Sequence, residues 1–143
     1  MSMTAFHTAL EQWVVSTYST AFNVTVGSTN YSVKVFHDNL TPVTPADAPA
    51  VRFAVVLYDT VEGSPALTEG RGALLVQVFI EQGISADLAW KIAGTIEAAA
   101  KRSTFTTKGN FGASSLLGQP YTEPTHGLYQ LTLRIPFWYL EAA

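Results

Sequence analysis

The stretch that decides the fold is Gly72–Arg102, which reads GALLVQVFIEQGISADLAWKIAGTIEAAAKR. Its first part, Ala73–Ile80, is a short run of aliphatic, β-branched and aromatic residues with a glycine before it and Gly83 soon after it. Short apolar runs bounded by glycines are typical of buried strands. The sequence therefore predicts a strand over Ala73–Ile80.

The second part of the same stretch has the pattern of an amphipathic helix. Leu88, Ile92 and Ile96 recur every four residues, which places them on one helical face. Ser85 stands where an N-cap residue belongs, and a Lys-Arg pair closes the segment at the end where the helix dipole favours cations. A strand and a helix joined by a few residues pack face to face, so we expect this unit at the centre of a sheet.

Further segments carry patterns of regular structure. From Thr4 onward, apolar residues fall on one helical face for about four turns. Two β-rich segments, Asn23–Val26 and Tyr31–Phe36, flank a Gly-Ser-Thr-Asn turn and indicate a hairpin. Ala50–Tyr58 reads as another strand, and Leu128–Tyr139 alternates apolar and polar residues, as a strand with one buried face does.

Proline and glycine mark the connections between these elements. Asp38–Pro49 contains three prolines and is predicted to be a long exposed loop. Thr60–Gly72 is polar and glycine-rich, so we expect it to form the tip of a long β-hairpin arm. In chain order after the central helix we expect an edge strand at Thr104–Thr107, a turn at Lys108–Gly112, a loop at Gln119–Gly127, and an edge or bulge at Pro136.

Length and composition indicate one domain spanning residues 1–143. Charged residues make up 13% of the chain, about half of the roughly 25% that is usual for soluble domains. A surface with so few charges is poorly protected against association, which favours burial of part of it against other subunits. A neutral, threonine-rich β surface explains the same composition, and both interpretations stay open.

The charge pattern and the absence of cysteine exclude several classes of site. The net charge is −3 and the cations are scattered, so sequence-specific nucleic-acid binding is not expected. Without cysteine there are no disulfides, thiolate metal sites or cysteine nucleophiles. No signal-peptide pattern opens the sequence and no apolar run approaches the roughly 18 to 20 residues of a membrane span, so we expect a soluble protein made in the cytoplasm.

The residue types that usually serve in catalysis or metal binding do not form a recognisable motif. The histidines at 7, 37 and 126 lack metal-ligand spacing, and no Gly-x-Ser-x-Gly elbow is present, although residue order alone leaves a Ser-His-acid triad open. We therefore expect no enzyme activity, no cofactor and no metal. Among the aromatics, Trp138 is the residue left over for an interface, whereas Trp90 fits either the helix flank or an exposed contact.

Four segments together resemble the tail-terminator family of long-tailed bacteriophages. Phe6–Glu11 opens a short amphipathic helix. Asn39–Pro45, followed by Pro49–Phe53, is similar to the family's Asn-x-x-Phe-x-Pro loop and the strand after it, with Leu40 and Val43 where an aromatic residue is common. Gly70–Phe79 resembles the strand that follows the hairpin tip, and Gly127–Phe137 resembles the closing segment that ends in Ile-Pro-Phe.

The resemblance implies an α+β fold with a mixed or antiparallel β-sheet flanked by two α-helices. It also implies a homohexameric ring that sits on the last ring of tail-tube protein, halts tube growth and meets the head-side connector. Such a protein is located in the virion, at the tail or neck, after assembly in the host cytoplasm, with its lumen open to DNA.

Loop placement and charge suggest which residues make the contacts of such a ring. We expect Glu62, Glu69 and Arg71 on the hairpin arm to touch neighbouring subunits or the tube. We expect the loop that contains Asn39 and Asp47 to face a stacked partner.

Two other interpretations remain. The first is a head-completion or stopper protein of the neck, which differs in whether it binds the tube end or the portal-side adaptor first. The second is a small ligand-binding or hydrolytic α+β domain that uses Asp38–Pro49 as a lid over His37 and His126.

Overall fold

The computed structural model describes residues 3–37, 45–64, 67–81, 83–84, 86–101, 104–106, 109–122, 124 and 127–142. Its elements, in chain order, are α1 (Met3–Tyr18), β1 (Ala21–Val26), β2 (Thr29–His37), the 3₁₀ helix η1 (Pro45–Asp47), β3 (Ala50–Ser64), β4 (Leu67–Ile80), α2 (Ala86–Lys101), β5 (Thr104–Thr106), β6 (Gly109–Phe111), β7 (Ser115–Leu116), β8 (Tyr121–Thr122) and β9 (Tyr129–Ala142).

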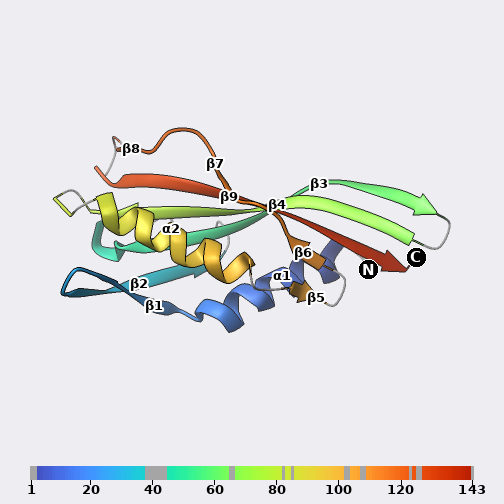
Figure 1. The fold of residues 1–143 in the computed structure, drawn as a ribbon, viewed down its shortest axis with the longest axis horizontal. Helices are drawn as coiled ribbons and strands as arrows, with labels where there is room; N and C mark the ends of the chain where they lie inside the picture. The colour runs from blue at the N-terminus through green and yellow to red at the C-terminus, as the bar shows by residue number, and fades with distance from the viewer. Residues whose placement is uncertain are drawn as a thin grey trace.

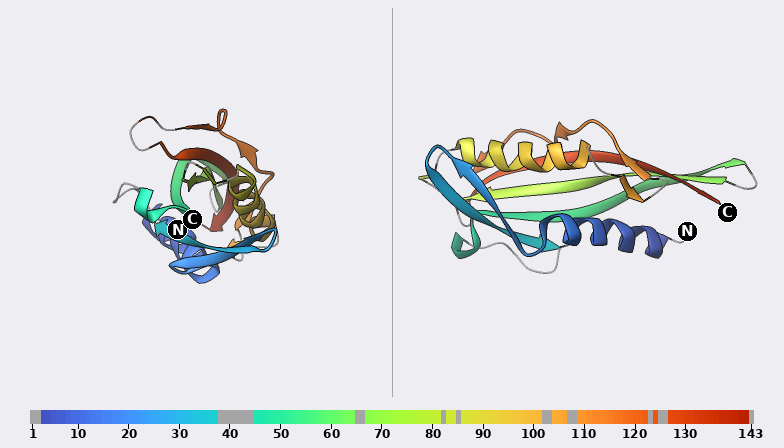
Figure 2. Two further views of the ribbon diagram at one scale, coloured as in Figure 1. Left: turned by 90° about the vertical axis from the view of Figure 1, so that its left-hand side faces the viewer. Right: turned by 60° about the horizontal axis from the view of Figure 1, so that its bottom comes forward.

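All the strands belong to one curled sheet (Figures 1 and 2). Its order is β1-β2-β3-β4-β9-β6-β5, and β7 and β8 also pair with β9. The pairing of β2 with β3 is parallel, and the other pairings among the described strands are antiparallel. The chain is therefore an α+β protein with a mixed sheet, and β4 lies at its centre as predicted.

Both helices bury apolar side chains in one core against the sheet. α2 contributes the predicted stripe of Leu88, Ile92 and Ile96, each at most 1% exposed. α1 contributes Leu10 and Val14 to the same cluster. Burying a large aliphatic side chain stabilises a fold by about 1.5 to 3 kcal/mol, so this shared core holds the two helices and the sheet together.

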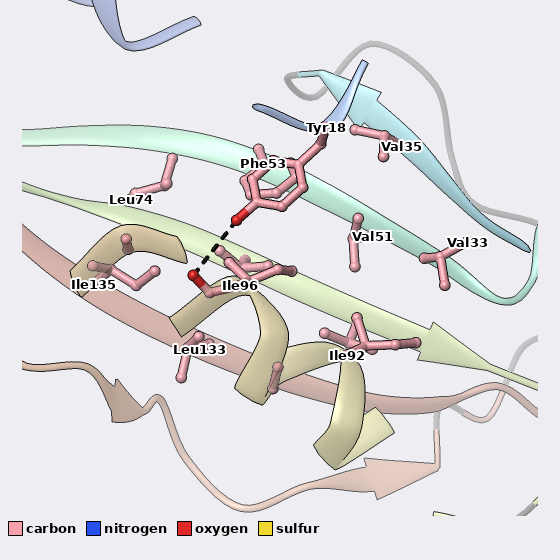
Figure 3. Close-up of a cluster of buried hydrophobic side chains, with 14 of the residues drawn as sticks. Tyr18, Val33, Val35, Val51, Phe53, Leu74, Ile92, Ile96, Leu133 and Ile135 are labelled. Atoms are coloured by element: carbon pink, nitrogen blue, oxygen red, sulfur yellow. Dashed lines mark hydrogen bonds between the residues drawn. The ribbon is translucent and has the colours of Figure 1, made fainter. Parts of the chain in front are cut away.

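Tyr18 joins the two helices inside this core (Figure 3). Its ring stacks on Phe53 of β3 with centroids 5.3 Å apart, and its hydroxyl donates to the carbonyl of Ile96 in α2 at 3.5 Å. Burial raises the pKa of the Tyr18 hydroxyl well above its ordinary value. The end of α1 is thereby fixed against both β3 and α2.

The structure confirms the predicted β-hairpin arm and corrects the extent of its strands. Residues 60–72 do not form a polar connector, because β3 continues to Ser64 and β4 begins at Leu67. The two strands pair along this length with register shifts between Leu57 and Asp59 and between Glu62 and Ser64. β9 pairs with the other side of β4 as far as Leu67, and this third strand is the support that local composition did not reveal.

An edge or a bulge was predicted at Pro136, and of these two alternatives the edge was wrong. Beyond Pro136, the segment Phe137–Tyr139 pairs with β6 on one side and with β4 on the other. Pro136 is tolerated because it falls between the residues that pair with β6 and those that pair with β7, and there its carbonyl accepts a hydrogen bond from the Gly112 N–H at 2.7 Å.

Short strands replace two predicted irregular segments. Gly109–Phe111 of the predicted turn forms β6, and Tyr121–Thr122 of the predicted loop forms β8. The edge strand expected at Thr104–Thr107 is present as β5, which ends the strand order of the sheet. The predicted N-cap, Ser85, lies outside the described residues.

Candidate functional site

A three-stranded arm projects from the core beyond the end of α2 (Figures 1 and 2). We define the arm as residues Leu57–Ser64 of β3, Leu67–Gly72 of β4 and Phe137–Ala142 of β9. β4 is its middle strand, since it pairs with β3 on one side and with β9 on the other. The arm is therefore a continuation of the central sheet.

Gly72 marks the point where the arm leaves the core. A Cβ at this position would collide with the carbonyl oxygen of Val56 and with the ring of Phe137. The register shift between Leu57 and Asp59 lies directly opposite Gly72. Bulges increase the local twist of a sheet. Close backbone approach at a glycine thus shapes the base of the arm.

Arg71 and Trp138 are neighbours on the arm. They are directly opposite one another in the β4–β9 pairing, and Asp59 of β3 is opposite Arg71 on its other side. Arg71 is exposed, and Trp138 is 41% exposed. A Cβ added at Gly112 would lie 2.9 Å from the Trp138 ring, so the indole rests against the backbone that follows β6. Half-exposed tryptophans beside an arginine are typical of interface hot spots.

The arm is the acidic part of the chain. Its strands carry Asp59, Glu62, Glu69 and Glu141 against one cation, Arg71, so their net charge of −3 equals that of the whole protein. The remainder of the chain is neutral in sum. Charge is thus separated between the arm and the core, a pattern that gives an electrostatic preference for one partner surface over another.

The structure brings four of the six predicted contact residues together. Glu62 and Glu69 lie on β3 and β4 of the arm, together with Arg71 and Trp138. Asp47 lies in η1 at the opposite end of the molecule from the arm (Figure 2), and Asn39 lies outside the described residues.

Asp47 belongs to a different surface, a shallow hollow of about 450 Å³ between η1 and the β1–β2 hairpin. Its carboxylate forms an ion pair with Lys34 of β2, with 3.1 Å between Oδ1 and Nζ. The Lys34 side chain is 57% exposed, and exposed pairs of this kind contribute at most about 1 kcal/mol. This ion pair holds η1 near β2 rather than marking a catalytic group.

Sequence reasoning missed a second hollow, about 300 Å³, between α2 and β7. Trp90, Leu116 and Leu133 line it together with Glu97 and Ser114. Trp90 is 47% exposed at the rim of this hollow, so its side chain is not buried between the helix flank and the sheet. The only sequence signal for this hollow was the carboxylate of Glu97 on the polar side of α2. Its partner, Ser114, comes from a segment without hydrophobic periodicity.

Glu97 ties α2 to the segment before β7. Its carboxylate accepts a short hydrogen bond from the Ser114 hydroxyl, and Lys101 Nζ lies 3.5 Å from Glu97 Oε1. The Ser114 hydrogen bond, and then Lys101, hold the pKa of Glu97 below its usual value. The carboxylate is therefore ionised at neutral pH and anchors this connection.

The described residues give no support to a catalytic or metal site. Among them, no group of three His, Asp or Glu side chains is placed to hold a metal ion. His37 is the last residue of β2, and His126 lies outside the described residues. In the part of the chain that the structure describes, no helix is long and apolar enough to cross a membrane.

The fold and the arm define a single-domain α+β protein with one projecting, acidic surface. No protein-family model matches the chain, and no curated protein matches it either.

Proposed function

We propose that the protein is a virion structural protein of a long-tailed phage, which assembles as a six-membered ring on the end of the tail tube. The ring ends tube elongation and forms the interface to the head-side connector. The observation that carries this proposal is the arm, a β-structure that extends beyond the end of α2 (Figures 1 and 2). The resemblance of four sequence segments to tail terminators is the reason for proposing this particular assembly, a ring on the tail tube.

The arm supports an assembly role because a narrow β-sheet needs another layer or chain packed against it to be stable. Two- or three-stranded sheets gain little stability without a hydrophobic face packed on another layer. Among the residues whose burial the structure describes, the core cluster reaches Phe137, and β3, β4 and β9 extend to Ser64, Leu67 and Ala142. A β-arm that reaches past its own core has the form of an element that is completed by a neighbour.

The test is microscopy and light scattering of the purified protein, alone and mixed with tail tubes that lack a terminator. We expect rings of uniform diameter, and rings seated at one end of each tube whose further growth then stops. Protein that remains monomeric at high concentration and does not associate with tubes would contradict the proposal.

The same experiment separates a terminator from a stopper of the neck. A terminator binds the tube end in the absence of any head component. Binding to the portal-side adaptor first, with no affinity for free tubes, would identify a stopper in its place.

A further inference from the structure

The hollow between α2 and β7 combines an aromatic ring with a carboxylate. One face of α2 forms its first side, since Trp90, Gly94 and Glu97 stand at positions i, i+4 and i+7 of the helix. Leu116 of β7 and the buried Leu133 of β9 also line it. Trp90 and Glu97 are separated by about 10 Å along the helix axis. The hollow is therefore an apolar slot with an indole toward one end and a carboxylate toward the other.

Gly94 keeps the space between these two groups open. A Cβ added at Gly94 would meet open space, and the residue lies within the lining of the hollow. Glycine in the interior of a helix is less favourable than alanine, so helix stability does not account for it here. A larger side chain at this position would project between Trp90 and Glu97 and fill the slot.

Glu97 is the one charged group among the described residues that line the hollow, and its carboxylate has room for a further partner. Its side chain is 38% exposed, the Ser114 hydroxyl donates to Oε2, and Lys101 Nζ lies 3.5 Å from Oε1. A carboxylate has about four acceptor positions, and a hydroxyl oxygen that donates can still accept. Lys101 is more exposed than Glu97, and exposed ion pairs of this kind are weak. A second cation can therefore bind at Glu97 and Ser114.

The rest of the lining suits a cation on an aliphatic stem. The face of an indole attracts a guanidinium or ammonium group, and a guanidinium also stacks on the ring. Methylene groups of a long side chain pack favourably on leucines such as Leu116 and Leu133. The volume of about 300 Å³ stands at the lower limit of ligand sites, which is enough for one long side chain but not for a larger molecule.

We propose that this hollow binds the side chain of an arginine, or less tightly of a lysine, presented by a partner polypeptide. The cationic group binds Glu97 and Ser114, and the aliphatic stem lies over Gly94. Leu116 and Leu117 are exposed beside the hollow, so apolar residues that flank the arginine gain further contact. The site goes beyond the proposed ring, whose assembly does not require it.

A pair of matched peptides tests the proposal. The probe is acetyl-Leu-Arg-Leu-amide, and its control carries citrulline in place of arginine, which has the same shape without the charge. The protein is labelled with fluorotryptophan, so that its three tryptophans each give a fluorine NMR signal, and Trp90→Phe assigns one of them. We expect the Trp90 signal alone to shift to saturation, and the citrulline peptide to bind about fivefold more weakly.

Two variants of α2 should change the affinity in opposite directions. Glu97→Gln keeps an acceptor for Ser114 but removes the negative charge, and is expected to weaken binding about fivefold. Lys101→Gln removes the cation that competes for the carboxylate, and is expected to strengthen binding. Glu11→Gln on α1 is the matched control, since it changes the net charge as Glu97→Gln does, and it should leave the affinity unchanged.

Gly94→Leu tests whether the open slot is the binding site. Leucine is the better helix former, so thermal unfolding followed by circular dichroism should show a folded variant. Its side chain occupies the slot, and we expect the saturable shift of the Trp90 signal to be lost. This result separates a blocked site from a misfolded protein.

Free arginine is the third probe, because it has the same guanidinium group without flanking residues. It is expected to bind more weakly than the peptide, since it makes no contact with Leu116 and Leu117 outside the slot. Free arginine that binds more tightly than the peptide would overturn the assignment to a partner polypeptide.

Three further outcomes would overturn the inference. They are a Trp90 signal that does not move with the peptide, equal affinity for the citrulline peptide, and unchanged binding in Gly94→Leu. The measurement needs neither rings nor tail tubes, so its failure leaves the proposed function standing. Conversely, a protein that binds the arginine peptide but forms no rings would retain this site and lose the proposed function.

Discussion

At the scale of single residues, glycines that look alike in the sequence have opposite roles. Gly72 is buried between the Val56 carbonyl and the Phe137 ring, whereas Gly94 lies on the exposed side of α2 with no atom within 4 Å of an added Cβ. Glycine is required at the first position and costs helix stability at the second.

We therefore expect Gly72→Ala and Gly94→Ala to change stability in opposite directions. Gly72→Ala should destabilise the protein by about 1 to 3 kcal/mol or more, because backbone cannot yield as a flexible side chain can. Gly94→Ala should stabilise it by about 0.8 to 1 kcal/mol. Urea unfolding of both variants measures the two effects, and equal changes would show that the base of the arm is not closely packed.

Tyr18 predicts a dependence of stability on alkaline pH. Burial raises its pKa in the folded state above the ordinary value of 10.0, while the unfolded chain keeps that ordinary value. The folded state thus retains a proton that the unfolded state loses, so the free energy of unfolding falls as pH rises above 10.

Tyr18→Phe removes this titration. Between about pH 9 and about pH 11 the unaltered protein should lose about 1.4 kcal/mol more stability than the variant. At neutral pH the free energy of unfolding of the variant should be lower by less than about 1 kcal/mol, since the hydrogen bond that the Tyr18 hydroxyl donates to Ile96 is long. Urea unfolding across this pH range gives the difference, and parallel curves would rule out a buried phenol.

The two exposed tryptophans form a natural comparison. Trp138 is on the arm and Trp90 is on the rim of the hollow beside α2. Trp138→Ala is expected to weaken ring assembly at least about tenfold, and Trp90→Ala to leave it unchanged, because hot spots lie within interfaces. Light scattering over a concentration series measures both, and an equal loss in the two variants would remove Trp138 from the interface.

At the scale of elements, patterns within one segment could be read and pairings between distant segments could not. α2 and β4 were predictable because Leu88, Ile92 and Ile96 repeat at helical spacing and Ala73–Ile80 is an apolar run interrupted only by Gln77. The hairpin arm was also predictable, but the strands within residues 60–72 were not, since their glycines and charges have the composition of a loop and β9, which pairs with β4 there, is far away in sequence.

The short strands β6, β7 and β8 show the same limit. Each has only two or three residues and is defined by backbone pairing with β9 rather than by a pattern of its own. For the candidate site, the aromatic and charged residues of the arm could be named from the sequence. The alignment of Asp59, Arg71 and Trp138 in one row across three strands could not be predicted, because it depends on register.

The contact between α2 and the segment before β7 predicts a loss of stability in acid. The pKa of Glu97 is lowered in the folded state, first by the Ser114 hydrogen bond and then by Lys101. The ionised carboxylate therefore stabilises the folded protein above the ordinary pKa value of 4.5, and this stabilisation is lost as the pH falls below that value. Ser114→Ala should lower stability near pH 7 by no more than about 1 kcal/mol, given the exposure of the pair, and should have less effect near pH 3. Urea unfolding at the two pH values tests this, and a larger effect in acid would contradict it.

At the scale of the whole molecule, an acidic arm that contacts a surface of opposite charge in the proposed ring makes assembly sensitive to salt. We expect the ring to dissociate more readily as salt rises from about 0.05 M to about 0.5 M, over which the Debye length falls from more than 10 Å to less than 8 Å. Sedimentation velocity at constant protein concentration measures the change. Rings that tighten with added salt would indicate an interface dominated by apolar contacts.

The position of Ala142 also has a practical consequence. β9 ends at this residue, which pairs with Leu67 beside the far end of the arm. An affinity tag or fluorescent protein fused after the last residue would therefore sit where we place the contact with a neighbour, and a fusion that is well folded could still be inactive. Reporters are better inserted at the β1–β2 turn, at Gly27 and Ser28, which are exposed and lie at the other end of the molecule (Figure 1).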